Sequence, residues 1–213
     1  HDLGGGFHII ELVSPQFRGV DWSPGQKLQI GVGRGFSYRT YTPIEWEAGR
    51  GLTRIIAYAH GDGPGSDWVR TVKAGDRCEV FGPRASLAPG SLESPIILFG
   101  DETSLGLAAA IRLQGASQGL SCVFEVNSAA AVHAALDLDS FAIHGARLFE
   151  RRPDDAHLAE IAAALLSDLG ASVILTGKAT SIQRLRTGLL RGGVPRSRLL
   201  TKAYWAPGKK GLD

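Results

Sequence analysis

Arg39-Thr40-Tyr41-Thr42-Pro43 is the stretch that decides the fold, and it ends an alternating, strand-like segment. Its arginine is a fixed cation of the kind that binds a diphosphate. Tyr41 follows two residues later with a flat ring suited to packing against a planar heterocycle, and Thr42 adds a hydroxyl and a backbone N–H. The same residues also make an ordinary β-strand, so a second signal is needed to choose between the two interpretations.

That second signal is His60-Gly61-Asp62-Gly63-Pro64-Gly65-Ser66-Asp67-Trp68. It follows the apolar, strand-forming run Leu52–His60, which the glycines break. Ser66 is predicted to cap a short helix that continues to Lys73. The free N–H groups at such a helix start make a natural phosphate site. An ordinary Gly/Pro turn would look similar, but the order of the two segments favours a pyrophosphate site.

The whole chain has the composition of an ordinary globular protein, with 213 residues and a net charge of +2. That length fits one large domain or two small ones. The near-neutral charge argues against a nucleic-acid partner. We see no apolar run long enough to span a membrane and no signal peptide, so we expect a cytoplasmic protein without membrane insertion. Its two cysteines lack iron–sulfur spacing and its six histidines lack ligand spacing, so no bound metal is expected.

Residues 1–92 are predicted to form a small antiparallel β-barrel domain. Alternating or apolar runs separated by Pro and Gly indicate its strands. These runs are His8–Val13, Lys27–Val32, Tyr38–Thr42, Leu52–His60 and Arg77–Phe81.

Residues 93–213 are predicted to form a doubly wound α/β domain, and the boundary falls in the Pro/Gly/Ser-rich segment Ala88–Ser94. Strands alternating with helices imply parallel βαβ units. The expected strands are Pro95–Phe99, Leu120–Val126, Phe141–Phe149, Ser172–Thr176 and Arg198–Trp205. The expected helices are Thr103–Gln118, Ala129–Leu136, Asp154–Leu169 and Thr180–Arg191. Such sheets bind ligands at the carboxyl ends of their strands.

Two strand-end loops of this domain are candidate sites. In Gly100-Asp101-Glu102-Thr103-Ser104, Thr103 or Ser104 can cap the next helix, whose start could face a phosphate or a nicotinamide. The two acids oppose a phosphate, and a plain capped helix explains them equally well. Thr176-Gly177-Lys178-Ala179 should lie beside it, with Gly177 allowing close approach of a cofactor. By contrast, Gly31-Val32-Gly33-Arg34-Gly35 precedes a strand, so we interpret it as a hairpin.

The last segment combines aromatic and basic residues: Lys202, Tyr204 and Trp205, then Lys209 and Lys210. In one interpretation the aromatic residues fill an interdomain core and the lysines are solvated. In the other, an aromatic ring lies near a cofactor and the lysines attract a polyanionic substrate.

Together these motifs resemble the siderophore-interacting protein family, the flavin-dependent ferric-siderophore reductases of the ferredoxin-reductase superfamily. The order is R-x-Y-T-P, H-G-D-x-G-P-x-S-x-W, G-D-E-T-S, G-K-A and a terminal Y-W, and it spans essentially the whole chain. Two positions depart from the family pattern. Lys178 stands where an acidic residue is expected, and Ala206 stands where an arginine is usual.

The resemblance implies FAD between barrel and sheet, with NADH or NADPH as co-substrate and a ferric siderophore as electron acceptor. Thr42 and His60 would tune the flavin, and no side chain need act as acid, base or nucleophile. Lys202, Lys209 and Lys210 would bind the substrate. Cofactor contacts are expected from Arg39, Thr40, Tyr41, Thr42, His60, Gly63, Pro64, Gly65, Ser66, Trp68, Asp101, Thr103, Ser104, Gly177 and Trp205.

Several alternatives stay open at this point. Glu125, near the end of the second parallel strand, would favour NADH through a ribose hydroxyl, whereas the basic C-terminal third favours NADPH or ferredoxin as the donor. The protein could also be a general flavin or ferredoxin-type reductase, a ferric-siderophore binding protein without turnover, or a flavoprotein that binds FAD for stability alone.

Overall fold

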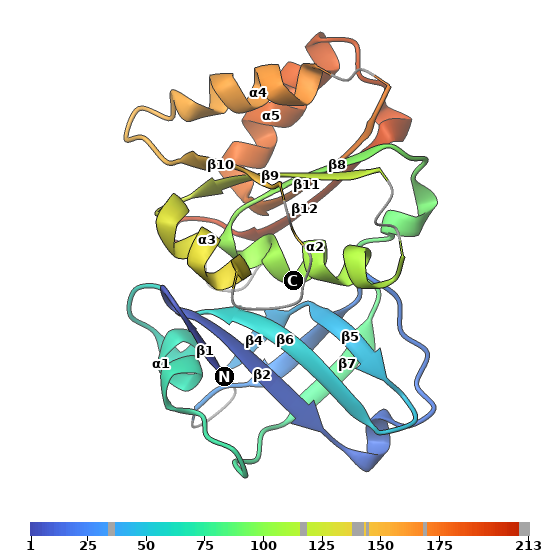
Figure 1. Ribbon diagram of the computed structural model, residues 1–213, viewed down its shortest axis with the longest axis vertical. Helices are drawn as coiled ribbons and strands as arrows, with labels where there is room; N and C mark the ends of the chain where they lie inside the picture. The colour runs from blue at the N-terminus through green and yellow to red at the C-terminus, as the bar shows by residue number, and fades with distance from the viewer. Residues whose placement is uncertain (34–36, 116–118, 138–142, 144, 168–169, 209–213) are drawn as a thin grey trace.

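The computed structural model describes residues 1–33, 37–115, 119–137, 143, 145–167 and 170–208. An antiparallel β half is followed by a half in which helices cover both faces of a parallel sheet (Figure 1). No helix among these residues is long and apolar enough to cross a membrane. The predicted fold class is confirmed: an antiparallel β unit is followed by a parallel α/β unit.

The N-terminal half consists of two antiparallel sheets around a shared core. One sheet has the order β1-β2-β6-β5 and the other β4-β3-β7. Their strands are β1 (Asp2–Gly4), β2 (Phe7–Val13), β3 (Lys27–Gly31), β4 (Tyr38–Tyr41), β5 (Pro43–Glu47), β6 (Leu52–Tyr58) and β7 (Val80–Arg84). Leu28, Ile30 and Ile55 are fully buried between the sheets, as expected for alternating strands with one apolar face.

The C-terminal half has a five-stranded parallel sheet in the order β10-β9-β8-β11-β12. The strands are β8 (Ile96–Gly100), β9 (Leu120–Val126), β10 (Arg147–Glu150), β11 (Ser172–Lys178) and β12 (Leu199–Trp205). The helices of the protein are α1 (Pro64–Thr71), α2 (Leu105–Leu113), α3 (Ala129–Asp137), α4 (His157–Leu166) and α5 (Ala179–Arg191). Short 3-10 turns are η1 (Pro15–Phe17), η2 (Pro89–Ser91), η3 (Glu102–Ser104) and η4 (Arg196–Arg198).

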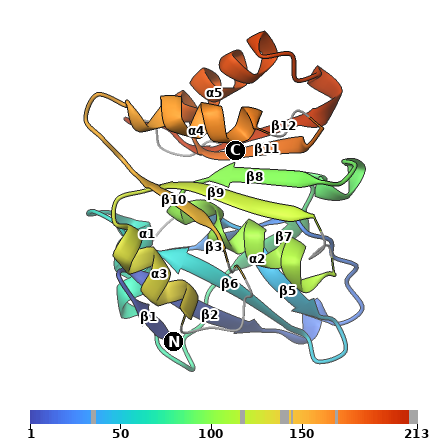
Figure 2. The ribbon, with the colours of Figure 1, turned by 45° about the horizontal axis from the view of Figure 1, so that its top comes forward.

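The order of this sheet reverses between β8 and β11, which are hydrogen-bonded neighbours. Connections from β8 and β11 therefore leave on opposite faces, and α2 and α5 cover the two faces (Figures 1 and 2). A reversal of this kind opens a crevice at the carboxyl ends of the strands. The two predicted loops, after β8 and at the end of β11, meet there as expected.

The two halves share one continuous apolar core. Phe7 and Ile9 on β2 and Ile44 on β5 belong to the same buried cluster as Leu107 on α2 and Phe124 on β9. Gly106 on α2 lies so close to the barrel that a Cβ there would be 3.2 Å from the carbonyl oxygen of Thr42. The barrel is thus packed firmly against α2 and α3, with α4 and α5 on the far face of the sheet (Figure 2).

Several predicted boundaries differ from the structure. Strand β7 starts three residues later than predicted, at Val80, and β5 was not predicted because Pro43 argues against a strand interior. Helix α4 starts at His157, because Pro153–Asp155 form a turn in which Asp155 has a positive φ of 55°. The predicted helix Thr103–Gln118 is the η3 turn followed by α2.

Four expected segments fall partly outside the described residues, and the predicted helices Thr103–Gln118 and Asp154–Leu169 both end in residues that the description does not cover. Of the predicted strand Phe141–Phe149, the structure describes β10 from Arg147 onward. The predicted hairpin at Gly31–Gly35 includes residues 34 and 35, which the description does not cover.

Candidate functional site

A cavity of about 420 Å³ lies between the barrel and the end of β12. Its volume is in the range of small-molecule and cofactor sites. Eleven of the predicted site residues line it: Arg39, Thr40, Tyr41, Thr42, His60, Gly63, Gly65, Ser66, Thr103, Lys202 and Trp205. Additional lining residues that were not predicted include Lys27, Tyr58, Ser86 and Tyr204. Lys209 and Lys210 lie outside the described residues.

Strand β4 supplies one wall of this cavity. The Nη1 atom of Arg39 donates to the carbonyl oxygen of Tyr38 at 2.8 Å, which fixes the guanidinium direction. Gly65 makes room for this side chain, because a Cβ at Gly65 would be 3.0 Å from Arg39 Cγ. Burial raises the pKa of Tyr41 to about 12, so its ring presents a neutral phenol. Trp68 packs beside Tyr41, with ring centroids 5.9 Å apart, and supports this wall.

The start of α1 lies at the same cavity, but Ser66 is not its cap. Gly63 is the N-cap, with a φ of 148° that suits glycine. Ser66 is the third residue of the helix, and its hydroxyl donates to the carbonyl oxygen of His60 at 2.7 Å. No described side chain caps this helix start. Its backbone N–H groups and the guanidinium of Arg39 therefore form a cationic corner that suits a diphosphate.

The end of β12 supplies the opposite wall, where a β-bulge turns two aromatic residues toward the cavity. Gly177 pairs with Ala203, but Lys178 pairs with Trp205, so Tyr204 is the additional residue. Neighbouring residues of a regular strand would point to opposite faces, whereas Tyr204 and Trp205 both line this cavity. Burial raises the pKa of Tyr204, which hydrogen-bonds with the Thr42 side chain. The bulge thus re-aims side chains at a site, as bulges often do.

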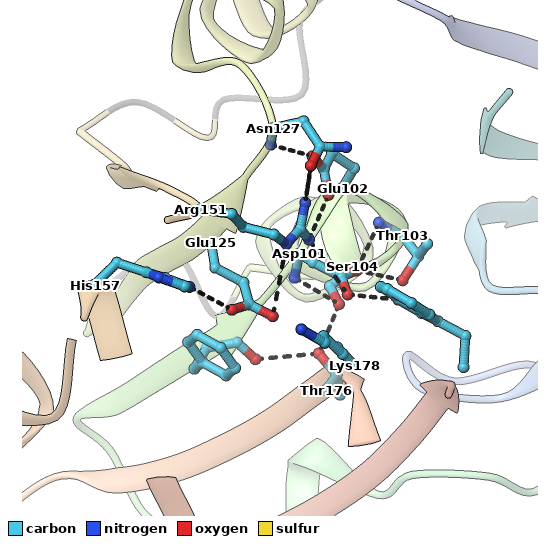
Figure 3. Close-up of polar contacts among 12 residues, drawn as sticks. Asp101, Glu102, Thr103, Ser104, Glu125, Asn127, Arg151, His157, Thr176 and Lys178 are labelled. Atoms are coloured by element: carbon cyan, nitrogen blue, oxygen red, sulfur yellow. Dashed lines mark hydrogen bonds and ion pairs between the residues drawn. The ribbon is translucent and has the colours of Figure 1, made fainter. Parts of the chain in front are cut away.

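The loop after β8 is held by buried hydrogen bonds. Asp101, not Thr103 or Ser104, caps this turn: its Oδ1 accepts from the backbone N–H of Thr103 at 2.9 Å and from the Thr103 hydroxyl. The hydroxyl of Thr176 donates to Ser104 Oγ at 2.9 Å (Figure 3). Asp101 and Ser104 are fully buried. Their side chains therefore hydrogen-bond to other protein groups. A contact of these two residues with a cofactor stays a prediction, and it would come from their backbone atoms.

Three buried carboxylates surround one arginine at the carboxyl ends of the strands. Arg151 makes two hydrogen bonds with Glu102, of 3.0 and 2.8 Å, and donates to Asn127 Oδ1 at 2.8 Å (Figure 3). Asp101 and Glu125 each have one carboxylate oxygen 3.9 Å from the guanidinium. The pKa of Asp101 is raised by burial, although hydrogen bonds from Thr103 and Trp205 oppose that shift. This cluster was not predicted, because in the sequence Arg151 lies close to Arg147 and Arg152, as in a solvated basic surface.

Glu125 does not have the role that its position suggested. It is fully buried, and its Oε2 lies 3.0 Å from Nε2 of His157. The backbone N–H of Arg152 donates to Nδ1 of His157, which leaves the proton of the neutral ring on Nε2. Glu125 therefore accepts a hydrogen bond from His157, and the prediction that it binds a ribose hydroxyl is wrong. A carboxylate one residue before a strand end can turn toward the protein interior or toward a ligand, and the sequence does not reveal which.

A second cavity, of about 150 Å³, adjoins the first. Tyr58, His60, Thr103 and Trp205 line both, so these side chains form the partition between them. The remaining lining comes from the polar cluster: Glu102, Asn127 and Arg151. Among the described residues, no group of three or more His, Cys, Asp or Glu side chains could hold a metal ion.

The fold is that of the ferredoxin-reductase-like proteins. Solved structures with this fold include the siderophore-interacting protein SipS from Aeromonas hydrophila, with a TM-score of 0.76, 20% identity, and coverage of 99% of this chain and 89% of that one. A siderophore utilization protein from T. fusca has a TM-score of 0.75 and 23% identity, over 100% of this chain and 92% of that one. The flavohem-like FAD/NAD-binding domain of nitric oxide dioxygenase from Vibrio cholerae has a TM-score of 0.74 and 21% identity, over 96% and 94%.

Family models place the chain more narrowly. Residues 23–87 match the siderophore-interacting FAD-binding domain, and residues 94–208 match the siderophore-interacting protein model. The chain therefore belongs to the siderophore-interacting protein family, and its N-terminal half is an FAD-binding domain. No curated protein sequence matches it significantly.

Proposed function

We propose that this protein is an FAD-dependent reductase that passes electrons from NADH or NADPH to the iron of a ferric siderophore and releases ferrous iron. The observation that carries the proposal is the pair of adjoining cavities, one with a flavin-type wall and one at the carboxyl ends of the parallel strands. A reductase needs a cofactor site that a donor and an acceptor can both reach. Because pyridine nucleotides are intracellular electron donors, the proposal includes a cytoplasmic location.

The residues of the larger cavity fit FAD. Arg39 and the uncapped start of α1 offer cationic groups to a diphosphate, and Gly65 leaves the space that this arrangement requires. Tyr41 offers a buried flat ring, and Thr42 offers polar groups beside it. FAD, when bound, supplies the conversion between two-electron and one-electron chemistry. The chain's own residues bind and orient it and exclude water.

The smaller cavity is proposed to receive the nicotinamide end of the donor. Three of its seven lining residues, Tyr58, His60 and Trp205, have planar rings against which a planar ligand ring can pack. The amide of Asn127 is fixed through its Oδ1 by Arg151, so its N–H₂ group is the part left to donate to a ligand. Because the Glu125 side chain is buried against His157, it gives no reason to prefer NADH over NADPH. Both nucleotides therefore stay in the proposal.

The acceptor is proposed to bind in the larger cavity near Lys27 and Lys202, which both line it. Lys27 comes from β3 and Lys202 from β12, so two segments distant in sequence bring cationic side chains to one cavity. Ferric catecholate chelates are polyanions, which such a site attracts. Hard oxygen ligands hold ferric iron far better than ferrous iron, so reduction itself releases the metal.

The test is an anaerobic titration of the FAD-loaded protein with NADH and then NADPH, followed by a ferric tris-catecholate chelate. We expect bleaching of the flavin absorbance by one nucleotide and recovery when the chelate is added. Lys202→Glu should raise the KM for the chelate about tenfold while leaving nucleotide-driven bleaching intact, because it reverses one charge at the acceptor end. Lys73→Glu, at an exposed position after α1, is the matched control.

Each alternative has its own outcome. Bleaching without recovery on the chelate, but with recovery on other acceptors, would favour a general flavin or ferredoxin-type reductase. Stoichiometric chelate binding without nucleotide oxidation would favour a binding protein. If neither NADH nor NADPH bleaches the flavin, although dithionite reduces it normally, the proposed electron donor is wrong.

A further inference from the structure

The indole of Trp205 stands in the partition between the two cavities, and one buried carboxylate holds it. Its Nε1 donates to Oδ2 of Asp101 at 2.8 Å, across 104 positions of sequence. The ring is only partly buried, and its contact with His60 is loose, with centroids 6.4 Å apart. The hydrogen bond to Asp101 is the directional contact that fixes the orientation of the indole.

The carboxylate of Asp101 is itself held in one orientation by its neighbours. Its Oδ1 is occupied by the two donors of Thr103, which directs Oδ2 toward Trp205. Gly177 provides the space for it, since a Cβ there would be 2.4 Å from Oδ2, and φ at Gly177 is +97°. Arg151 lies 3.9 Å from the same oxygen and gives electrostatic support. The ends of β8, β10, β11 and β12 thus converge on a single carboxylate.

The bulge in β12 explains why an anchor is required. It inserts Tyr204 as an additional residue, so strand alternation no longer dictates where Trp205 points. The two aromatic side chains are then fixed separately, Tyr204 by Thr42 of the barrel and Trp205 by Asp101 of the α/β half.

We propose that Asp101 is the positioning residue for Trp205, and that its hydrogen bond keeps the indole in place as a movable partition between the two cavities. Release of the indole would join the cavities, so that a planar ring in the smaller one could meet the cofactor in the larger one. The positioning role stands without the proposed function, whereas the effect on nucleotide binding rests on it.

The first test needs neither cofactor nor activity. In the ¹⁵N-labelled protein, each of the four tryptophans gives an indole N–H signal by NMR, and Trp205→Phe identifies its own by removing it. In Asp101→Asn the amide N–H₂ replaces Oδ2 as the group facing the indole, because Oδ1 stays with Thr103. We expect the Trp205 signal to move upfield and exchange with solvent at least tenfold faster, while the other three stay in place. Asp76→Asn, in an exposed barrel turn, should change none.

An unmoved Trp205 signal in a folded Asp101→Asn protein would overturn the proposal. Should that variant not fold, Thr103→Val removes one of the donors that orient the carboxylate, and it should move the same signal by a smaller amount. No movement there either would count equally against the positioning role.

The second test uses FAD-loaded protein and the oxidised nucleotides NAD⁺ and NADP⁺, followed by flavin difference spectra. Asp101→Asn should lower the dissociation constant of the nucleotide that binds about tenfold, because the partition moves more easily. In a Trp205→Phe background the same substitution should have no further effect, and an undiminished effect there would contradict the proposal. If neither nucleotide binds wild-type protein, the proposed donor fails, and the NMR result alone decides the role of Asp101.

Discussion

At the scale of single residues, Arg39 makes the sharpest prediction for cofactor binding. Arg39→Gln should raise the dissociation constant of FAD about 10- to 100-fold, because charge-assisted hydrogen bonds contribute about 1.5–3 kcal/mol. Quenching of FAD fluorescence on titration measures this directly. Arg50→Gln removes an exposed arginine that pairs with Glu47 in the same half of the protein, and it should bind FAD like wild type. Equal affinities for both variants would exclude Arg39 from the diphosphate site.

Tyr41 predicts how stability depends on alkaline pH. Its pKa is raised by burial to about 12, so the unfolded chain loses this proton near pH 10 while the folded protein keeps it. Its stability contribution is complete below pH 10 and is lost as pH rises toward 12. By pH 11 the free energy of unfolding should fall by about 1 kcal/mol from this group alone. Urea unfolding at pH 9 and pH 11 checks this, and Tyr41→Phe should show a smaller fall; an identical fall would contradict it.

The residues that sequence reasoning could and could not place differ in a physical way. Arg39 and Tyr41 could be placed in one cavity wall because residues two apart in a strand share a face, and Thr42, directly after the strand, also lines the cavity. The burial of Asp101 and Glu125 was not predicted because acidic residues are rarely buried, and it depends on Arg151 and His157 from distant segments. Such pairing is created by the order of strands in the sheet, which no local pattern encodes.

At the scale of elements, prediction succeeded where one signal dominated. Strand β9 was predicted residue for residue, and α5 and β12 within one residue, because continuous apolar runs and helical spacing are strong signals. It failed at β5, which begins at a proline, and at α1, whose cap is a glycine rather than a serine. The bulge in β12 was also missed, since it arises from pairing with β11.

Helix α2 gives a prediction that separates packing from helix propensity. Gly106→Val should place a side chain against the carbonyl oxygen of Thr42, whereas a Cβ at Gly188 on α5 meets no atom within 4 Å. Both substitutions replace a helical glycine by valine, so the contact with the barrel should make Gly106→Val less stable than Gly188→Val by about 1–3 kcal/mol. Thermal or urea unfolding measures the difference. Equal stabilities would show that α2 can shift away from the barrel without cost.

At the scale of the whole molecule, the cavity is lined by both halves, so the cofactor should stabilise them together. FAD at 100 times its dissociation constant should raise the free energy of unfolding by about 2.7 kcal/mol. Because one apolar core joins the halves, calorimetry should show a single transition that moves as a unit. Riboflavin at equal concentration, which lacks the diphosphate, should raise it less. Two transitions, of which FAD moves one, would mean that the halves unfold independently.

The placement of the two cavity walls also affects how the protein is made. The wall from β4, β6 and α1 is synthesised early, whereas Tyr204 and Trp205 are among the last described residues to leave the ribosome. Until they do, the nascent barrel exposes Tyr41, Ile56 and Tyr58, which line the cavity in the folded protein. Domains generally fold in order of synthesis, and exposed apolar surface promotes aggregation. Flavin available during translation would cover that surface, so riboflavin starvation should lower the yield of folded protein as well as its cofactor content.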